Sequence, residues 1–189
     1  MAPLIPFTPE WRAARARKRS AKAYVATILA DPSAADAEWL AGAAAAGDVD
    51  HARWELRYVR MAVGIFVAER DALDDRTASE IANALRAEFA ADARVAPDLR
   101  PLADQQFADR VHAYRDAFFA RGTTGATERL GRVLLAFASD GARSAGGPLA
   151  RATEILAGYV VEANTALVAA YGSASLPDHL PPSEAVAKR

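Results

Sequence analysis

Residues 50–76, DHARWELRYVRMAVGIFVAERDALDDR, decide the fold that the sequence predicts. At 3.6 residues per turn this stretch forms one helix with two apolar stripes on roughly opposite sides. The first stripe consists of Trp54, Tyr58, Met61, Ile65, Ala68 and Ala72, and the second of Leu56, Val59, Val63, Phe66, Val67 and Leu73. A helix that is apolar on two sides is packed on two sides. We therefore expect this helix at the centre of a bundle.

Polar residues separate the two stripes along both edges of this helix. One edge carries Arg53, Arg57, Arg60 and Asp71 around Gly64, and the other carries His51, Glu55 and Glu69 around Ala62. Charged side chains are seldom fully buried unless they are paired. We expect them to reach solvent or to pair with charges on flanking helices. The small residues between them allow a neighbouring helix to approach closely.

The whole sequence predicts an all-α fold, a single bundle of six or seven mostly antiparallel helices around a central helix at about 50–73. Strand-like alternation is missing throughout. Helix-start signals recur along the chain, at Thr8-Pro9-Glu10, at Ser33 with Asp36, at Asp48 or Asp50, at Asp74 or Asp75, at Pro101 and at Pro148. We expect an extended arm at 1–7, the bundle domain at 8–172 and a Pro-rich flexible tail at 173–189.

Composition narrows the class of protein. With 52% hydrophobic and 25% charged residues, the chain has the balance of a globular domain. A formal net charge of -1 gives no overall attraction to nucleic acid or to anionic membranes. The chain has no cysteine, which excludes disulfides, thiolate metal ligands and a cysteine nucleophile. No apolar run reaches the ~18 residues of a membrane span, and no signal peptide is recognisable, so we expect a cytoplasmic protein.

Positive charge is concentrated in the predicted first helix. Arg12, Arg15, Arg19 and Lys22 line one face of it, and Glu10 is the only acid in residues 1–30. Such a face is typical of interaction with acidic or phosphate-rich partners. No helix-turn-helix pattern follows, so we do not expect specific nucleic-acid binding. The simplest expectation is that this helix docks on the acidic segment 31–76, within one chain or between two.

Two pairs of residues have spacings that suit a metal site. His51 and Glu55 are four residues apart, and Asp109 and His112 are three apart, so each pair shares a helix face. Ferritin-like di-iron bundles use Glu-x-x-His on two helices, and this chain contains no such motif. The pairs are therefore better explained as polar positions on helix surfaces.

Three aspartates, Asp71, Asp74 and Asp75, cluster at the end of the central helix. Clustered carboxylates hold Mg²⁺ in some proteins, but aspartate at a helix junction usually caps the next helix. We therefore predict no cofactor. A divalent metal at these aspartates, or at His51 and Glu55, is kept as a minor alternative.

The sequence contains no Gly-x-Ser-x-Gly, P-loop or Gly-x-Gly-x-x-Gly motif. The leading hypothesis is a non-enzymatic helical interaction or regulatory protein that acts through self-association, as a homo-oligomer, or through a protein partner. A second hypothesis is an enzyme that handles a metal or phosphate in the bundle core, with a polar cluster of Glu55, Arg57, Tyr58, Glu69, Asp109 and His112. A third is a bundle that binds a small apolar ligand beside Trp54 and Tyr58.

Overall fold

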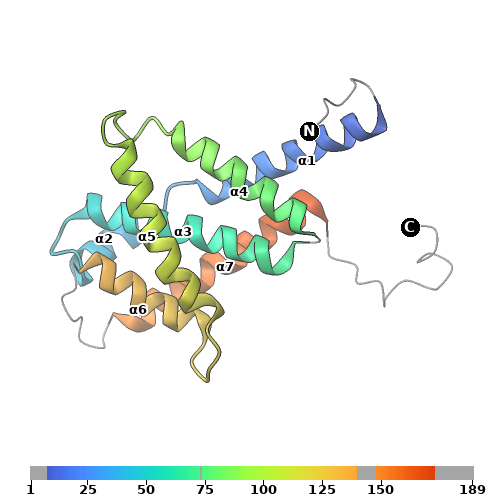
Figure 1. Ribbon diagram of the computed structural model, residues 1–189. Coiled ribbons are helices and arrows are strands. Elements are labelled where there is room, and N and C mark those ends of the chain that lie inside the picture. Colours follow the sequence, from blue (N-terminus) through green and yellow to red (C-terminus); the bar gives the residue numbers. More distant parts are fainter. Residues whose placement is uncertain (1–7, 73, 140–147, 173–189) are drawn as a thin grey trace.

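The computed structural model of the chain describes residues 8–72, 74–139 and 148–172. These residues form an all-helical bundle without a strand, which confirms the predicted fold class (Figure 1). Seven helices are described, namely α1 (Pro9–Ile28), α2 (Ala34–Ala43), α3 (Val49–Asp71), α4 (Asp75–Ala90), α5 (Arg100–Phe119), α6 (Ala126–Ala138) and α7 (Leu149–Tyr171). The arm and tail expected at 1–7 and 173–189 lie outside the described residues.

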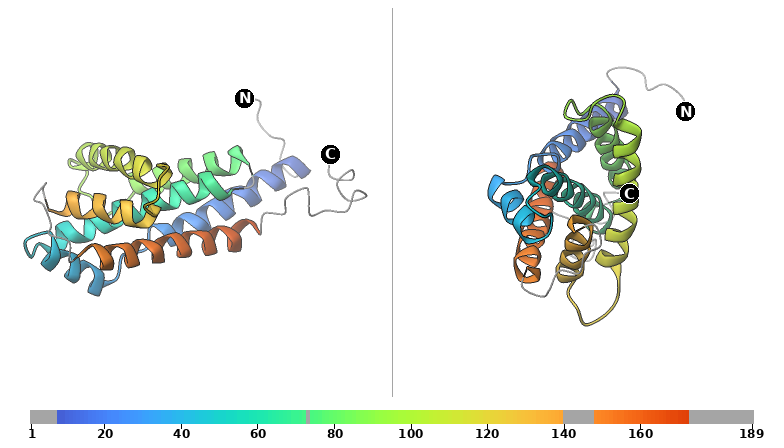
Figure 2. Two further views of the ribbon diagram at one scale, coloured as in Figure 1. Left: turned by 90° about the horizontal axis from the view of Figure 1, so that it is seen from below. Right: turned by 90° about the vertical axis from the view of Figure 1, so that its left-hand side faces the viewer.

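Helix α3 is the central helix that the two apolar stripes predicted. It contacts all six other helices, and in the right-hand view of Figure 2 the others surround it. Residues of both stripes are buried, among them Tyr58 and Met61 from the first and Leu56 and Phe66 from the second. None of the described helices is long and apolar enough to cross a membrane.

Local signals set the starts of four helices. Side-chain oxygens of Thr8, Ser33, Asp48 and Asp74 accept hydrogen bonds from backbone N–H groups in the first turns of α1, α2, α3 and α4. These bonds satisfy amides that have no partner inside the helix. At the other end of the chain, Gly172 follows α7 with φ +84°, a backbone conformation that favours glycine.

The close approach expected beside Gly64 occurs between α3 and the end of α1. A Cβ atom at Gly64 would lie 2.7 Å from Cγ2 of Ile28, so any larger residue at this position would have to displace the Ile28 side chain. The Tyr24 hydroxyl donates a hydrogen bond of 2.8 Å to the Gly64 carbonyl oxygen. The small residue on α3 thus allows the end of α1 to pack closely against α3.

The first helix meets the sequence expectation only in part. Its end packs on α3, within segment 31–76, but its ion pairs join Arg17 to Glu80 and Lys22 to Glu88 on α4. The physical reason is that α1 and α4 lie side by side on the bundle. Residues 9–20 of α1 contain no buried side chain, and this half of the helix extends away from the bundle (Figure 1).

Candidate functional site

A connected set of charged side chains surrounds Arg57, in the first half of α3. Its side chain is only 3% exposed, and its Nη2 donates a hydrogen bond of 2.6 Å to Oδ2 of Asp92. The guanidinium also lies over the ring of Trp54, 4.7 Å from the ring centre. Because Trp54 and Arg57 are three residues apart, the helix places them on one side. A buried cation is thus both paired and stacked.

Asp92 lies just beyond α4 and is the anion at the centre of this arrangement. Its Oδ1 accepts hydrogen bonds of 2.9 Å from both the backbone N–H and the Nε of Arg94. Burial alone would raise the pKa of Asp92, but the hydrogen bonds from Arg94 and Arg57 lower this pKa to about 2. Asp92 therefore remains a carboxylate throughout the neutral range, with its charge fully engaged.

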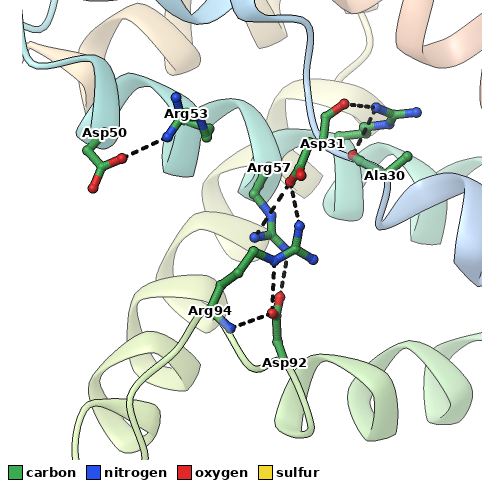
Figure 3. Close-up of polar contacts among 8 residues, drawn as sticks. Ala30, Asp31, Asp50, Arg53, Arg57, Asp92 and Arg94 are labelled. Carbon is green, nitrogen blue, oxygen red and sulfur yellow. Dashed lines mark hydrogen bonds and ion pairs between the residues drawn. The ribbon is translucent and has the colours of Figure 1, made fainter.

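The third segment of the network is the turn between α1 and α2. Asp31 in this turn accepts a hydrogen bond of 2.5 Å from Nη1 of Arg94 and lies 3.9 Å from Nη1 of Arg57. Figure 3 shows the resulting alternation of carboxylates and guanidinium groups, with the exposed pair of Asp50 and Arg53 apart from it. The network of Asp31, Arg57, Asp92 and Arg94 fastens the α1–α2 turn and the α4–α5 connector to α3.

An apolar hollow lies beside this network, between the first half of α3, the α4–α5 connector and the start of α5. Its volume is about 180 Å³. It is lined by Trp54, Tyr58, Arg94, Val95, Ala96, Leu99, Leu102, Ala103 and Gln106. Leu99 and Leu102 are 52% and 51% exposed. Two large, half-exposed apolar side chains therefore line the hollow, together with Arg94 of the network.

A second buried polar centre lies on α3, one turn before the middle of the helix. Glu55 is 1% exposed. Nε of Arg110 on α5 donates to both carboxylate oxygens, at 2.9 and 2.8 Å, and Nη2 of Arg110 also bonds Oε1. Burial would lower the pKa of Arg110, but the bonds to Glu55 outweigh it and raise that pKa. Both oxygens of Glu55 are therefore occupied in joining α3 to α5.

Arg60 supplies a third link from α3. Its guanidinium donates to the carbonyl oxygens of Thr27, Ala30 and Asp31, at 3.0, 3.0 and 3.2 Å, and to Oε1 of Glu162 on α7 at 2.6 Å. The last turn of α1 contains no basic residue of its own. Arg60 therefore neutralises the carbonyl end of α1 from a neighbouring helix.

The remaining residues of the predicted polar cluster do not gather around Glu55. Glu69 bonds Arg115 of α5 at 2.7 Å in an exposed ion pair. Asp109 and His112 are exposed on α5. Tyr58 lines the hollow and donates a hydrogen bond of 3.3 Å to Gln106. The structure therefore places Tyr58 at the hollow and Arg57 in the network beside it, and leaves the other members in separate contacts.

The residues weighed as metal ligands are also dispersed. Asp71 binds Arg70 and accepts a hydrogen bond from Asn164, and Asp74 caps α4, while Asp75 is exposed at its start. His51 is partly buried near the start of α3. Within residues 8–72, 74–139 and 148–172, no group of three or more histidine or acidic side chains is placed to hold a metal ion.

The basic face of α1 lies mostly on the half of the helix that extends from the bundle, and only Lys22 of this face lies beyond it, where it pairs with Glu88 of α4. Arg12, Arg15, Arg19 and Lys22 are all exposed. The guanidinium of Arg15 lies over the ring of Trp11, 5.2 Å from its centre. The four basic residues lie along a thinly packed helix, and none of them lines the hollow.

Sequence reasoning missed several residues of the network and hollow. Asp31 lies in the turn between α1 and α2, and Asp92, Arg94, Leu99 and Leu102 lie in or beside the α4–α5 connector. The sequence contains only a weak signal for the hollow. Two leucines, just before and after Pro101, interrupt a polar segment and belong to no helical stripe.

No protein-family model, curated protein sequence or solved structure matches this chain.

Proposed function

We propose that this chain is a non-enzymatic interaction protein, and that the hollow beside Trp54 receives an aromatic side chain from a protein partner. The observation that carries the proposal is the pairing of an apolar hollow with two half-exposed leucines at its rim, Leu99 and Leu102. Large apolar groups at a surface hollow mark sites of association more often than single exposed residues do.

The size of the hollow decides between a side chain and a free ligand. Pockets for small molecules usually measure about 300–1,000 Å³ and bury most of their ligand. The hollow measures about 180 Å³, close to the ~150 Å³ apolar cavity that holds a benzene ring. This volume suits one phenyl or indole group that a larger partner presents. It favours the protein partner over the alternative of a small-ligand bundle.

The walls of the hollow favour an aromatic group in particular. Tyr58 belongs to an aromatic cluster in which its ring centre lies 5.7 Å from that of Trp54, 6.0 Å from Phe107 and 6.4 Å from Phe89. Tilted and offset aromatic pairs at these separations are attractive beyond their buried area. Arg94 adds a cation at the wall, which suits the face of an aromatic ring.

The rigidity of the site supports the same conclusion. The network of Asp31, Arg57, Asp92 and Arg94 fixes the connector that forms one wall. A pre-formed site loses little conformational entropy when it binds. The buried charges thus serve the hollow by holding its shape. This role requires no chemical step at Glu55, whose oxygens are occupied by Arg110.

The test is a selection of peptides from a displayed random library against the full chain, followed by fluorescence polarisation with the selected peptides. We expect the selected sequences to share an aromatic residue, and Leu102→Glu to weaken their binding at least tenfold. Leu102 lies in the first turn of α5 and is half exposed, so an acid is well tolerated there.

Val161→Glu, an apolar-to-acid change at an exposed position on α7, is the matched control and should change the affinity less than twofold. Replacing the aromatic residue of the peptide by alanine should abolish binding. A library that yields no enriched peptide, or peptides that bind the Leu102→Glu chain as tightly as the original, would refute the proposal. Tight binding of free indole or phenol without any peptide would instead support the small-ligand alternative.

A further inference from the structure

Two uncharged polar side chains line the hollow beside Trp54, one from α3 and one from α5. Tyr58 and Gln106 both belong to its wall, and the Tyr58 hydroxyl donates a hydrogen bond of 3.3 Å to Oε1 of Gln106. Burial raises the pKa of Tyr58, so its hydroxyl keeps its proton in the neutral range and remains a donor. The two residues therefore form a polar pair in a wall that is mainly apolar.

The hydrogen bond between these two residues leaves part of their bonding capacity unused. A phenol oxygen can accept one hydrogen bond while it donates another, and a carboxamide has two N–H donors besides its oxygen. Among the described residues, the Tyr58 hydroxyl and the Gln106 side-chain amide make no other hydrogen bond. The pair therefore presents an acceptor, the Tyr58 oxygen, and a donor, the Gln106 N–H. Turning the amide end for end exchanges these roles and still leaves one donor and one acceptor.

A hydroxyl group matches a neighbouring donor and acceptor, because it accepts one hydrogen bond and donates another. Of the side chains of phenylalanine, tyrosine and tryptophan, only that of tyrosine carries a hydroxyl. The phenyl ring has no polar atom, and the indole N–H can only donate, so it leaves the Gln106 amide without a partner. A polar group that loses water and gains no partner opposes binding. Hydrogen bonding thus distinguishes three side chains that are all large and apolar.

The volume of the hollow agrees with a phenol group. The hollow measures about 180 Å³, whereas an apolar cavity of ~150 Å³ holds a benzene ring. The difference is close to the ~30 Å³ that one water molecule occupies in the liquid. A phenol, which is a benzene ring with one added oxygen, therefore fills the hollow more closely than a bare phenyl group does.

We infer that the aromatic side chain received by the hollow is that of a tyrosine, and that Gln106 selects it over phenylalanine. This inference rests on the function proposed above and names the residue that the partner presents. The partner's hydroxyl donates to the Tyr58 oxygen and accepts from the Gln106 N–H, while the apolar part of the wall contacts the ring. The bond from Tyr58 to the Gln106 oxygen holds the amide in place for this contact.

The test compares matched peptides. Peptides selected against the full chain are synthesised with tyrosine, phenylalanine or tryptophan at their shared aromatic position, and their dissociation constants are measured by fluorescence polarisation. The unchanged chain should bind the tyrosine peptide about five- to tenfold more tightly than the phenylalanine peptide, which is the size of effect typical of one hydrogen bond. The tryptophan peptide should also bind less tightly than the tyrosine peptide.

Gln106→Met removes the amide and keeps an unbranched side chain on α5. It should bring the tyrosine and phenylalanine peptides within twofold of each other, mainly by weakening the tyrosine peptide. Gln105→Met is the matched control, because Gln105 is exposed and does not line the hollow, and it should leave the preference unchanged.

The outcomes separate this inference from the proposed function. Equal binding of the tyrosine and phenylalanine peptides by the unchanged chain, or a preference for tyrosine that survives Gln106→Met, overturns the inference and leaves the proposed function standing. If no aromatic peptide binds the chain at all, the proposed function fails and this inference fails with it.

Discussion

Replacing Arg57 by methionine tests whether the buried network determines the stability of this end of the bundle. Methionine keeps an unbranched side chain against Trp54 but removes the charge that faces Asp92 at 2.6 Å. Breaking a buried ion pair by removing one partner typically costs 3–5 kcal/mol, because the other charge stays buried. Asp92 keeps its two bonds from Arg94, so we expect the lower end, about 3 kcal/mol.

The assay is urea unfolding followed by the helical circular dichroism signal, with the free energy of unfolding extrapolated to zero urea. For a chain of this size the expected loss corresponds to a fall in melting temperature of roughly 6–12 °C. Arg53→Met is the control on the same helix. Its ion pair with Asp50 is exposed, with side chains 45% and 82% accessible, so its loss should cost less than about 0.5 kcal/mol.

A double-mutant cycle checks the cause. Asp92→Asn removes the charge that Arg57→Met leaves without its main partner, so the double variant should lose less stability than the two single losses together. We expect a coupling free energy of about 1–3 kcal/mol. The reasoning is refuted if Arg57→Met costs no more than Arg53→Met, or if the two single losses are additive.

Three further predictions concern pH, packing and the end of α1. The Asp92 pKa is about 2 in the folded chain and about 3.9 in an unfolded one. Its contribution of about 1–2 kcal/mol to the free energy of unfolding is therefore complete above pH ~4 and is lost as pH falls toward 2. Asp92→Asn should flatten the pH dependence of the unfolding free energy across that window, and an unchanged slope would contradict this. Gly64→Ala should destabilise by about 1–3 kcal/mol because its Cβ would lie 2.7 Å from Ile28, whereas Gly42→Ala, which has open space, should not destabilise in the same melting experiment. Arg60→Met should cost about 3 kcal/mol in urea unfolding because it leaves carbonyls at the end of α1 and an acid of α7 without their donor, and a loss below about 1 kcal/mol would show that water replaces the guanidinium.

The parts of the fold that depend on neighbouring residues in the sequence were predictable. The two stripes of α3 alternate at helical spacing, which is a property of one segment, and their burial follows from it. The caps at Thr8, Ser33, Asp48 and Asp74 are equally local, because each side chain bonds an amide three residues further on. Such signals are complete within a few residues of sequence.

The candidate site could not be predicted in the same way, because its contacts join distant segments. Arg57 and Asp92 are 35 residues apart, and Glu55 and Arg110 are 55 apart. A helical pattern shows which face of a helix is apolar but not which neighbour covers it. The sequence therefore predicted correctly that charges on α3 are paired with other charges. It could not predict which residues they pair with, because this depends on how the helices pack. The hollow is harder still to predict from the sequence, because a connector supplies part of its wall.

The buried charges and the exposed apolar groups have complementary roles in this molecule. Arg57, Glu55 and Arg60 each join α3 to a different set of neighbours, so α3 holds the connector, α5 and the end of α1 in place. Of the large apolar side chains that this scaffold leaves uncovered, Leu99 and Leu102 lie at the start of α5, Phe119 lies at its end, and Val161 and Val168 lie on α7. If the hollow beside Leu102 were a contact between two copies of this chain, Leu102→Glu would lower the molar mass measured in solution. If the hollow receives a protein partner, the same variant weakens the binding of that partner and leaves the molar mass of the chain unchanged.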